Sequence, residues 1–181
     1  KIDAILFDLD GTLAELDWTT PQWARTHLHW LDDLITPERR ANDIRRLMVA
    51  VEGMVNFVVS QSRRFKPRQE VDAGISWLNH LRGHPPADQL RPIPGVPQML
   101  EQLATQYRLG IISTRPRAEI LLFLEKADLT PDQFALLIGR EDVSNLLPHS
   151  DPLLAATNRL FLEPNQVLMV SDTDSNLRSA R

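Results

Sequence analysis

Three short apolar runs in this sequence each lead directly into a cluster of Asp, Ser or Thr. Short, nearly continuous apolar runs are typical of strands buried on both faces of a parallel sheet. Ligands bind beyond the carboxyl ends of such strands, so the clusters should converge if the strands are neighbours. The clusters are Asp8 with Asp10 after residues 2–7, Ser113 with Thr114 after residues 109–112, and Asp172 with Asp174 after residues 167–170.

Helical patterns separate these runs. The spacing of apolar residues predicts helices over residues 96–107, 117–129 and 152–160, and residues 134–138 read as a further short strand. Strands that alternate with helices of this length are typical of a parallel sheet covered on both faces. We therefore expect an α/β fold with a Rossmann-like parallel sheet core.

Residues 15–91 have a different pattern. Apolar residues recur at intervals of three and four between Ala41 and Val58, and Thr36-Pro37 marks the start of that helix. Further helices are expected near residues 21–34 and 68–81, and all four tryptophans (Trp18, Trp23, Trp30 and Trp77) lie in this segment. We predict an α-helical cap over residues 15–91, inserted into a core made of residues 1–14 and 92–181.

The composition excludes several classes of function. A net charge of −4 gives no sign of nucleic-acid binding, and the absence of cysteine excludes disulfides and thiolate chemistry. No apolar run approaches the roughly 20 residues of a membrane span, and no signal-peptide pattern precedes the first strand. We expect a cytoplasmic protein without membrane contact, as a monomer or a homodimer.

The carboxylates suggest a reaction. Carboxylates held close together repel one another and need a cation, and a small cation with oxygen ligands is Mg²⁺. With magnesium present, one carboxylate can attack phosphorus to form an aspartyl-phosphate, while a second moves protons to and from the reacting oxygens. The hydroxyl of Ser113 and nearby N–H groups are suited to hold phosphate oxygens.

These motifs resemble those of the haloacid dehalogenase superfamily, in its phosphoglycolate-phosphatase-like subgroup with a helical cap. The resemblance covers the whole chain, and PIPGV (92–96) is similar to the return from cap to core in that subgroup. The four motifs, in order, are DLDGT (8–12), IISTRP (111–116), PHSDPLL (148–154) and VSDTDSN (170–176).

The resemblance implies roles for individual residues. Asp8 would be the nucleophile and Asp10 the acid/base, with Mg²⁺ held by Asp8, the main-chain carbonyl of Asp10 and Asp172. Ser113, Thr114 and Arg115 would bind the substrate phosphate, and Asn176 and Asp174 would support the metal. Dehalogenases of the superfamily lack a carboxylate at the position of Asp10. The expected activity is therefore a Mg²⁺-dependent phosphatase acting on a small phosphorylated metabolite such as phosphoglycolate.

Two positions depart from the family pattern. Leu147 stands where the third motif normally has the lysine that neutralises the nucleophile and the phosphate, and Asn176 stands where a second aspartate is frequent. Arg115 is the best substitute cation by position, followed by Arg140, and His149 would have to be protonated to serve.

The departures leave two alternatives open. One is a phosphotransferase or sugar-phosphate mutase on the same scaffold, and the other is a catalytically degenerate binding protein. Members of the family usually continue beyond the fourth motif with the rest of a helix and a further strand.

Overall fold

A computed structural model of the chain describes residues 1–15, 85–147, 149–173 and 176–177. The chain divides into two compact units, one made of Lys1–Glu15 with Ala87–Arg181 and the other of Leu16–Pro86. The helices and tryptophans predicted for the cap lie outside the described residues. The architecture below is therefore that of the first unit.

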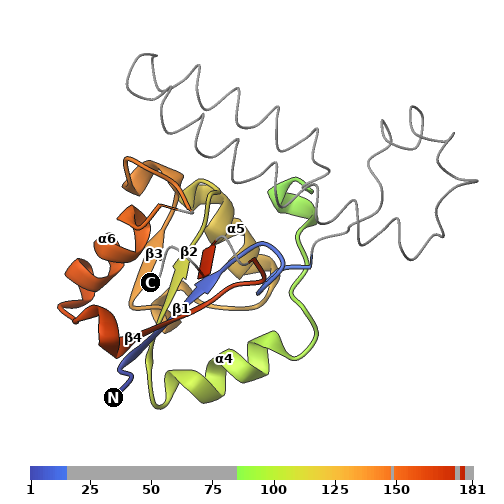
Figure 1. Cartoon of the computed structure of the whole chain (residues 1–181). Helices are drawn as coiled ribbons and strands as arrows, with labels where there is room; N and C mark the ends of the chain where they lie inside the picture. The colour runs from blue at the N-terminus through green and yellow to red at the C-terminus, as the bar shows by residue number, and fades with distance from the viewer. Residues whose placement is uncertain (16–84, 148, 174–175, 178–181) are drawn as a thin grey trace, which may run out of the picture. The chain divides into compact units, whose positions relative to one another are not determined.

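The first unit is built on a parallel sheet with the strand order β3-β2-β1-β4 (Figure 1). Its strands are β1 (Ala4–Asp8), β2 (Arg108–Ile112), β3 (Leu136–Ile138) and β4 (Val167–Val170). All four coincide closely with the apolar runs of the sequence. The α/β fold with a parallel sheet is confirmed.

The register of the strands aligns their carboxyl ends. Asp8, the last residue of β1, pairs with Ile112 of β2, and Phe7 pairs with Val170 of β4. Ser113 and Ser171 therefore follow their strands at the same edge of the sheet as Asp8. This alignment brings the described members of the three predicted polar clusters to one edge.

Helices cover both faces of the sheet, as expected. The helices α4 (Val96–Ala104) and α5 (Arg117–Lys126) pack on one face, and α6 (Asp151–Leu160) packs on the other. Successive side chains of β1 point to opposite faces of the sheet, as in any strand. Ile5 and Phe7 join the cluster that contains α4 and α5, whereas Ala4 and Leu6 join the cluster that contains α6.

Short 3₁₀ turns, η2 (Ala87–Gln89), η3 (Pro131–Gln133), η4 (Arg140–Asp142) and η5 (Pro164–Gln166), complete the described part. The turn η2 packs against α5, so the compact first unit resumes at Ala87, before the boundary predicted at residue 92. The chain leaving this unit at Glu15 meets the returning chain, since the Glu15 N–H donates to the carbonyl of Arg91 at 2.8 Å.

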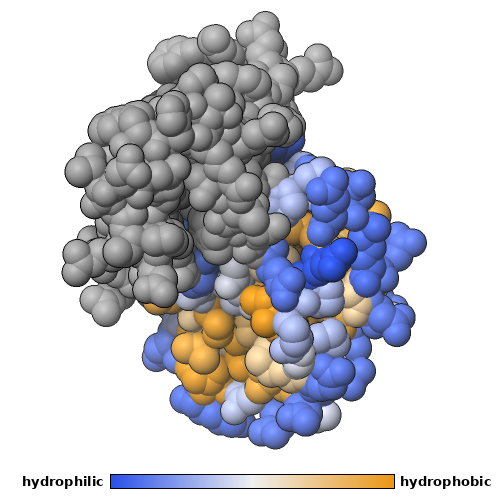
Figure 2. Space-filling model, turned by 90° about the vertical axis from the view of Figure 1, so that its right-hand side faces the viewer, coloured by the Kyte–Doolittle hydropathy of each residue, from blue (hydrophilic) through white to orange (hydrophobic). Residues whose placement is uncertain are grey.

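On the face shown in Figure 2, the described residues present polar areas and one apolar area. No described helix is both long enough and apolar enough to cross a membrane. Among the residues that the structure describes, six large apolar side chains are exposed, namely Met99, Leu121, Leu154, Phe161, Leu168 and Leu177.

Candidate active site

The turn after β1 carries the first two candidate residues. Gly11 adopts a left-handed conformation with a φ of 76°, which glycine accepts without steric cost. The carbonyl of Leu9 accepts hydrogen bonds from the N–H groups of Leu13 and Ala14 at 3.0 and 2.9 Å. This tight turn keeps Asp8 and Asp10 at the sheet edge, where their exposed fractions are 7% and 9%.

The carboxylate of Asp8 receives several hydrogen bonds. Its Oδ1 accepts from the N–H of Leu9 at 2.8 Å. Its Oδ2 accepts from the Asn176 amide Nδ2 at 2.8 Å and from the Ser171 hydroxyl at 3.1 Å. The resemblance implied that Asn176 would support the metal. In the structure, its amide contacts the predicted nucleophile directly.

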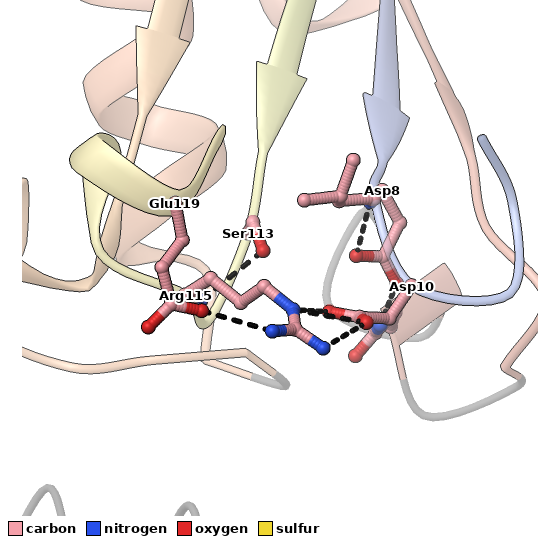
Figure 3. A network of polar contacts seen from close by, with 7 residues as sticks. Asp8, Asp10, Ser113, Arg115 and Glu119 are labelled. Atoms are coloured by element: carbon pink, nitrogen blue, oxygen red, sulfur yellow. Dashed lines mark hydrogen bonds and ion pairs between the residues drawn. The ribbon is translucent and has the colours of Figure 1, made fainter. Parts of the chain in front are cut away.

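The carboxylate of Asp10 is bound by Arg115 (Figure 3). The Arg115 Nε lies 2.8 Å from Oδ2 and 3.0 Å from Oδ1, and the terminal nitrogen Nη2 lies 2.8 Å from Oδ1. Both side chains are almost fully buried, with exposed fractions of 4% and 11%. A forked, buried contact of this kind is stronger than an ion pair at the surface.

A second carboxylate holds the other end of the guanidinium. The Arg115 Nη1 donates to Glu119 Oε2 at 2.9 Å, so the guanidinium lies between Glu119 and Asp10 in Figure 3. Burial by itself lowers the pKa of Arg115. The charge of Asp10 and the hydrogen bonds to Asp10 and Glu119 outweigh that effect and raise the pKa above its usual value. Arg115 is therefore a permanent positive charge at this site.

The residues after β2 form the other side of the site. Ser113 is 4% exposed, and its hydroxyl accepts a hydrogen bond from the main-chain N–H of Arg115 at 3.1 Å. A hydroxyl that accepts in this way keeps its own proton to donate. Thr114 is half-buried beside them. The structure thus places Ser113, Thr114 and Arg115 together, next to Asp10.

Asp172 reaches the site from the end of β4. Its N–H donates to the Thr12 hydroxyl at 3.1 Å, which ties the loop after β4 to the turn after β1. No group of three or more His, Cys, Asp or Glu side chains suited to a metal occurs among the described residues. The set implied by the resemblance needs only two carboxylates, from Asp8 and Asp172, with the Asp10 carbonyl.

These oxygen donors are chemically suited to Mg²⁺, which prefers carboxylate and carbonyl ligands. The hydrogen bond between the Asp172 N–H and the Thr12 hydroxyl brings Asp172 to the same edge of the sheet as Asp8. Asp174, predicted to support the metal, lies outside the described residues.

The position of the family lysine is part of the hydrophobic core. Leu147 is 1% exposed and packs in the cluster that contains α6. Of the three substitutes considered, Arg115 has its guanidinium on a carboxylate of the site. His149 instead pairs with Asp151 at 2.9 Å, and the main-chain N–H of Arg140 donates to the Arg115 carbonyl at 3.0 Å.

Three contributors were missed by sequence reasoning: Glu119, Thr12 and the Ser171 hydroxyl. The sequence contained a weak indication of Glu119, because Glu119 lies four residues after Arg115. Opposite charges at this spacing can form an ion pair along a helix. Ser171 and Thr12 carried no such signal, because their partners are distant in sequence.

Comparison with known proteins identifies the family of this chain. A family model described as haloacid dehalogenase-like hydrolase matches residues 5–181. The phosphoglycolate phosphatase of Salmonella paratyphi A is 33% identical over 208 aligned residues, covering 100% of this chain and 78% of that protein.

Solved structures share the fold. L-2-haloacid dehalogenase from Xanthobacter autotrophicus superposes with a TM-score of 0.66 at 19% identity, covering 99% of this chain and 74% of that one. A predicted phosphoglycolate phosphatase from Haemophilus somnus gives a TM-score of 0.61 at 23% identity, covering 99% and 80% of the two chains. The family-model match and the Salmonella relative show that this chain is a member of the haloacid dehalogenase-like hydrolase family.

Proposed function

We propose that this hydrolase is a Mg²⁺-dependent phosphatase that cleaves a small phosphorylated metabolite through an aspartyl-phosphate on Asp8. The observation that carries the proposal is the arrangement of Asp8, Asp10, Ser113 and Arg115 at one edge of the sheet. There Arg115 is hydrogen-bonded to Asp10 and to the Ser113 hydroxyl, and Asp8 accepts from Ser171.

The proposed reaction has two steps. A carboxylate oxygen of Asp8 attacks the substrate phosphorus, the phosphorus–oxygen ester bond breaks, and the departing alcohol oxygen takes a proton from Asp10. Asp10 then removes a proton from water as the water oxygen attacks the phosphorus. The bond between phosphorus and Asp8 breaks, which releases inorganic phosphate and restores both carboxyl groups.

Several chain groups are suited to the phosphate. The Ser113 hydroxyl has a proton to donate, and Arg115 supplies a positive charge beside it. Mg²⁺, held by Asp8, Asp172 and the Asp10 carbonyl, would reduce the repulsion between the anionic substrate and the carboxylates. The carboxylate at Asp10 favours phosphoester chemistry over dehalogenation, because a departing halide needs no proton.

The substrate class follows from the relatives. The Salmonella protein that matches the whole chain is a phosphoglycolate phosphatase, which supports a small phosphomonoester of that kind. A helical cap over residues 15–91, as predicted from the sequence, would also favour small substrates over polymers. The cytoplasmic location and the monomeric or homodimeric state stay predictions from the sequence.

Phosphate release tests the proposal. The protein is incubated with phosphoglycolate and a panel of other small phosphomonoesters, first with Mg²⁺ and then with EDTA. We expect metal-dependent release that disappears in Asp8→Asn and Asp10→Asn. Asn158→Asp, which alters an exposed residue of α6, is the control and should behave as wild type.

The same assay separates the alternatives. Phosphate transferred to a sugar acceptor rather than to water would indicate a phosphotransferase or mutase. A folded protein that binds Mg²⁺ but releases and transfers no phosphate would contradict the proposal. The buried Leu147 in place of the family lysine would then be the mark of a binding protein.

A further inference from the structure

The third motif does not supply the predicted nucleophile, Asp8, with the lysine that the family resemblance would place there. Leu147 occupies that position and is buried in the core cluster with α6. Arg115, which the sequence favoured as the substitute cation, binds Asp10 and Glu119. Among the described residues after β4, the side chains of Ser171 and Asn176 donate to Asp8, and both are neutral.

We propose that Ser171 and Asn176 are positioning residues that hold and stabilise the carboxylate of Asp8 in place of the third-motif lysine. The proposal deepens the proposed function, in which Asp8 is the nucleophile. It rests on the hydrogen bonds that the two side chains donate to one oxygen, Oδ2, at 3.1 and 2.8 Å.

The direction of the Ser171 hydroxyl is determined by its neighbours. Its oxygen accepts from the Asn176 amide at 3.2 Å and from the main-chain N–H of Thr173 at 3.4 Å. A hydroxyl has two lone pairs and one proton. With both lone pairs engaged by N–H donors, the proton is directed to Asp8.

The orientation of the Asn176 amide is equally constrained. Its NH₂ group donates to both Asp8 Oδ2 and Ser171 Oγ, and the flipped amide would put an oxygen against the carboxylate. The Asn176 main chain is anchored by a hydrogen bond from its N–H to the Thr173 hydroxyl at 3.4 Å. Asn176 is 7% exposed, so these contacts are shielded from water.

Each donor stabilises the ionised nucleophile and restricts its rotation. Hydrogen bonds to charged groups are about twice as strong as neutral ones. Together with the Leu9 N–H on Oδ1, at 2.8 Å, both oxygens of Asp8 are held. An aspartate at position 176, which the family often has, would repel Asp8 here, because position 147 holds leucine in place of the third-motif lysine.

Thermal unfolding in EDTA tests the contact without any need for activity. Asn176→Asp should lower Tm by about 4 °C or more, whereas the matched control Asn158→Asp should not. Combining Asn176→Asp with Asp8→Asn restores a donor–acceptor pair with the roles exchanged. We expect this double variant to recover most of the lost Tm. Additive losses, or an Asn176→Asp variant as stable as the control, would overturn the proposal.

Kinetics test the positioning role. Ser171→Ala should lower kcat about tenfold at nearly constant KM, while Ser171→Thr, which keeps the hydroxyl, should recover most of it. Ser144→Ala, at an exposed serine, serves as the control. An unchanged kcat in Ser171→Ala would overturn the proposal. A wild-type protein that releases no phosphate, yet shows the Tm recovery, would contradict the proposed function and leave the contact to Asp8 established.

Discussion

The guanidinium of Arg115 contacts both carboxylate oxygens of Asp10, with nitrogen–oxygen distances of 2.8 to 3.0 Å. Asp10 is the acid/base of the proposed reaction, so it has to take up and release a proton while Arg115 lies beside it. A substrate phosphate would compete for the same guanidinium, because both are anions that bind arginine in a forked geometry. Substrate binding would then weaken the contact that restrains Asp10.

Removal of the guanidinium should impair turnover strongly. We expect Arg115→Ala to lower kcat/KM about a hundredfold, since it removes a buried charge from the site of phosphate binding. Arg115→Lys should recover only part of the loss, because an ammonium group cannot form the forked contact. Added guanidinium ion should partly rescue Arg115→Ala in steady-state assays. Arg159→Ala, at an exposed arginine of α6, is the control.

Removing the charge of Glu119 should lower kcat/KM less than removing the guanidinium of Arg115. Glu119→Gln weakens the contact at Arg115 Nη1, but the Glu119 side chain is 37% exposed, so solvent screens the pair. We expect kcat/KM to fall about two- to fivefold. Glu125→Gln, on the same helix and exposed, should leave kcat/KM unchanged. Equal values for the two variants would show that Glu119 has no part in holding Arg115.

The charge of Arg115 should not titrate in the working range of an enzyme. Its pKa is raised in the folded state, so its stabilising contribution is complete below the unfolded pKa and is lost only as pH rises through the folded one. The difference in unfolding free energy between wild type and Arg115→Gln should therefore stay constant from about pH 6 to about pH 9. Urea unfolding at intervals across that range measures it, and a clear slope would contradict the assignment.

Introducing the family lysine at position 147 should destabilise this protein and should not raise its kcat. Leu147→Lys places an ammonium group in the apolar cluster beside α6 and should destabilise the fold by about 3 kcal/mol or more. Leu147→Met, which roughly keeps the volume, should cost less than about 1.5 kcal/mol. Urea unfolding compares the two variants. A stable Leu147→Lys protein with raised kcat would show that this position still faces the site.

The sequence was sufficient for the sheet and for the residues at its edge. Apolar runs predicted all four strands, and alternation with helices predicted the parallel sheet. These features depend on the local spacing of apolar residues, which can be read directly from a single sequence. The convergence of Asp8, Asp10 and Ser113 followed because parallel strands end at the same edge.

What only the tertiary structure decided is which polar groups meet. Arg115 was expected at the phosphate and is found on Asp10, 105 positions away along the chain, while Asn176 reaches Asp8 across 168 positions. Such pairs depend on strand order, register and loop conformation together, and a long side chain has several partners within reach. The burial of Leu147 is likewise a consequence of how α6 packs on the sheet. Local pattern therefore located the site, and three-dimensional packing assigned the partners within it.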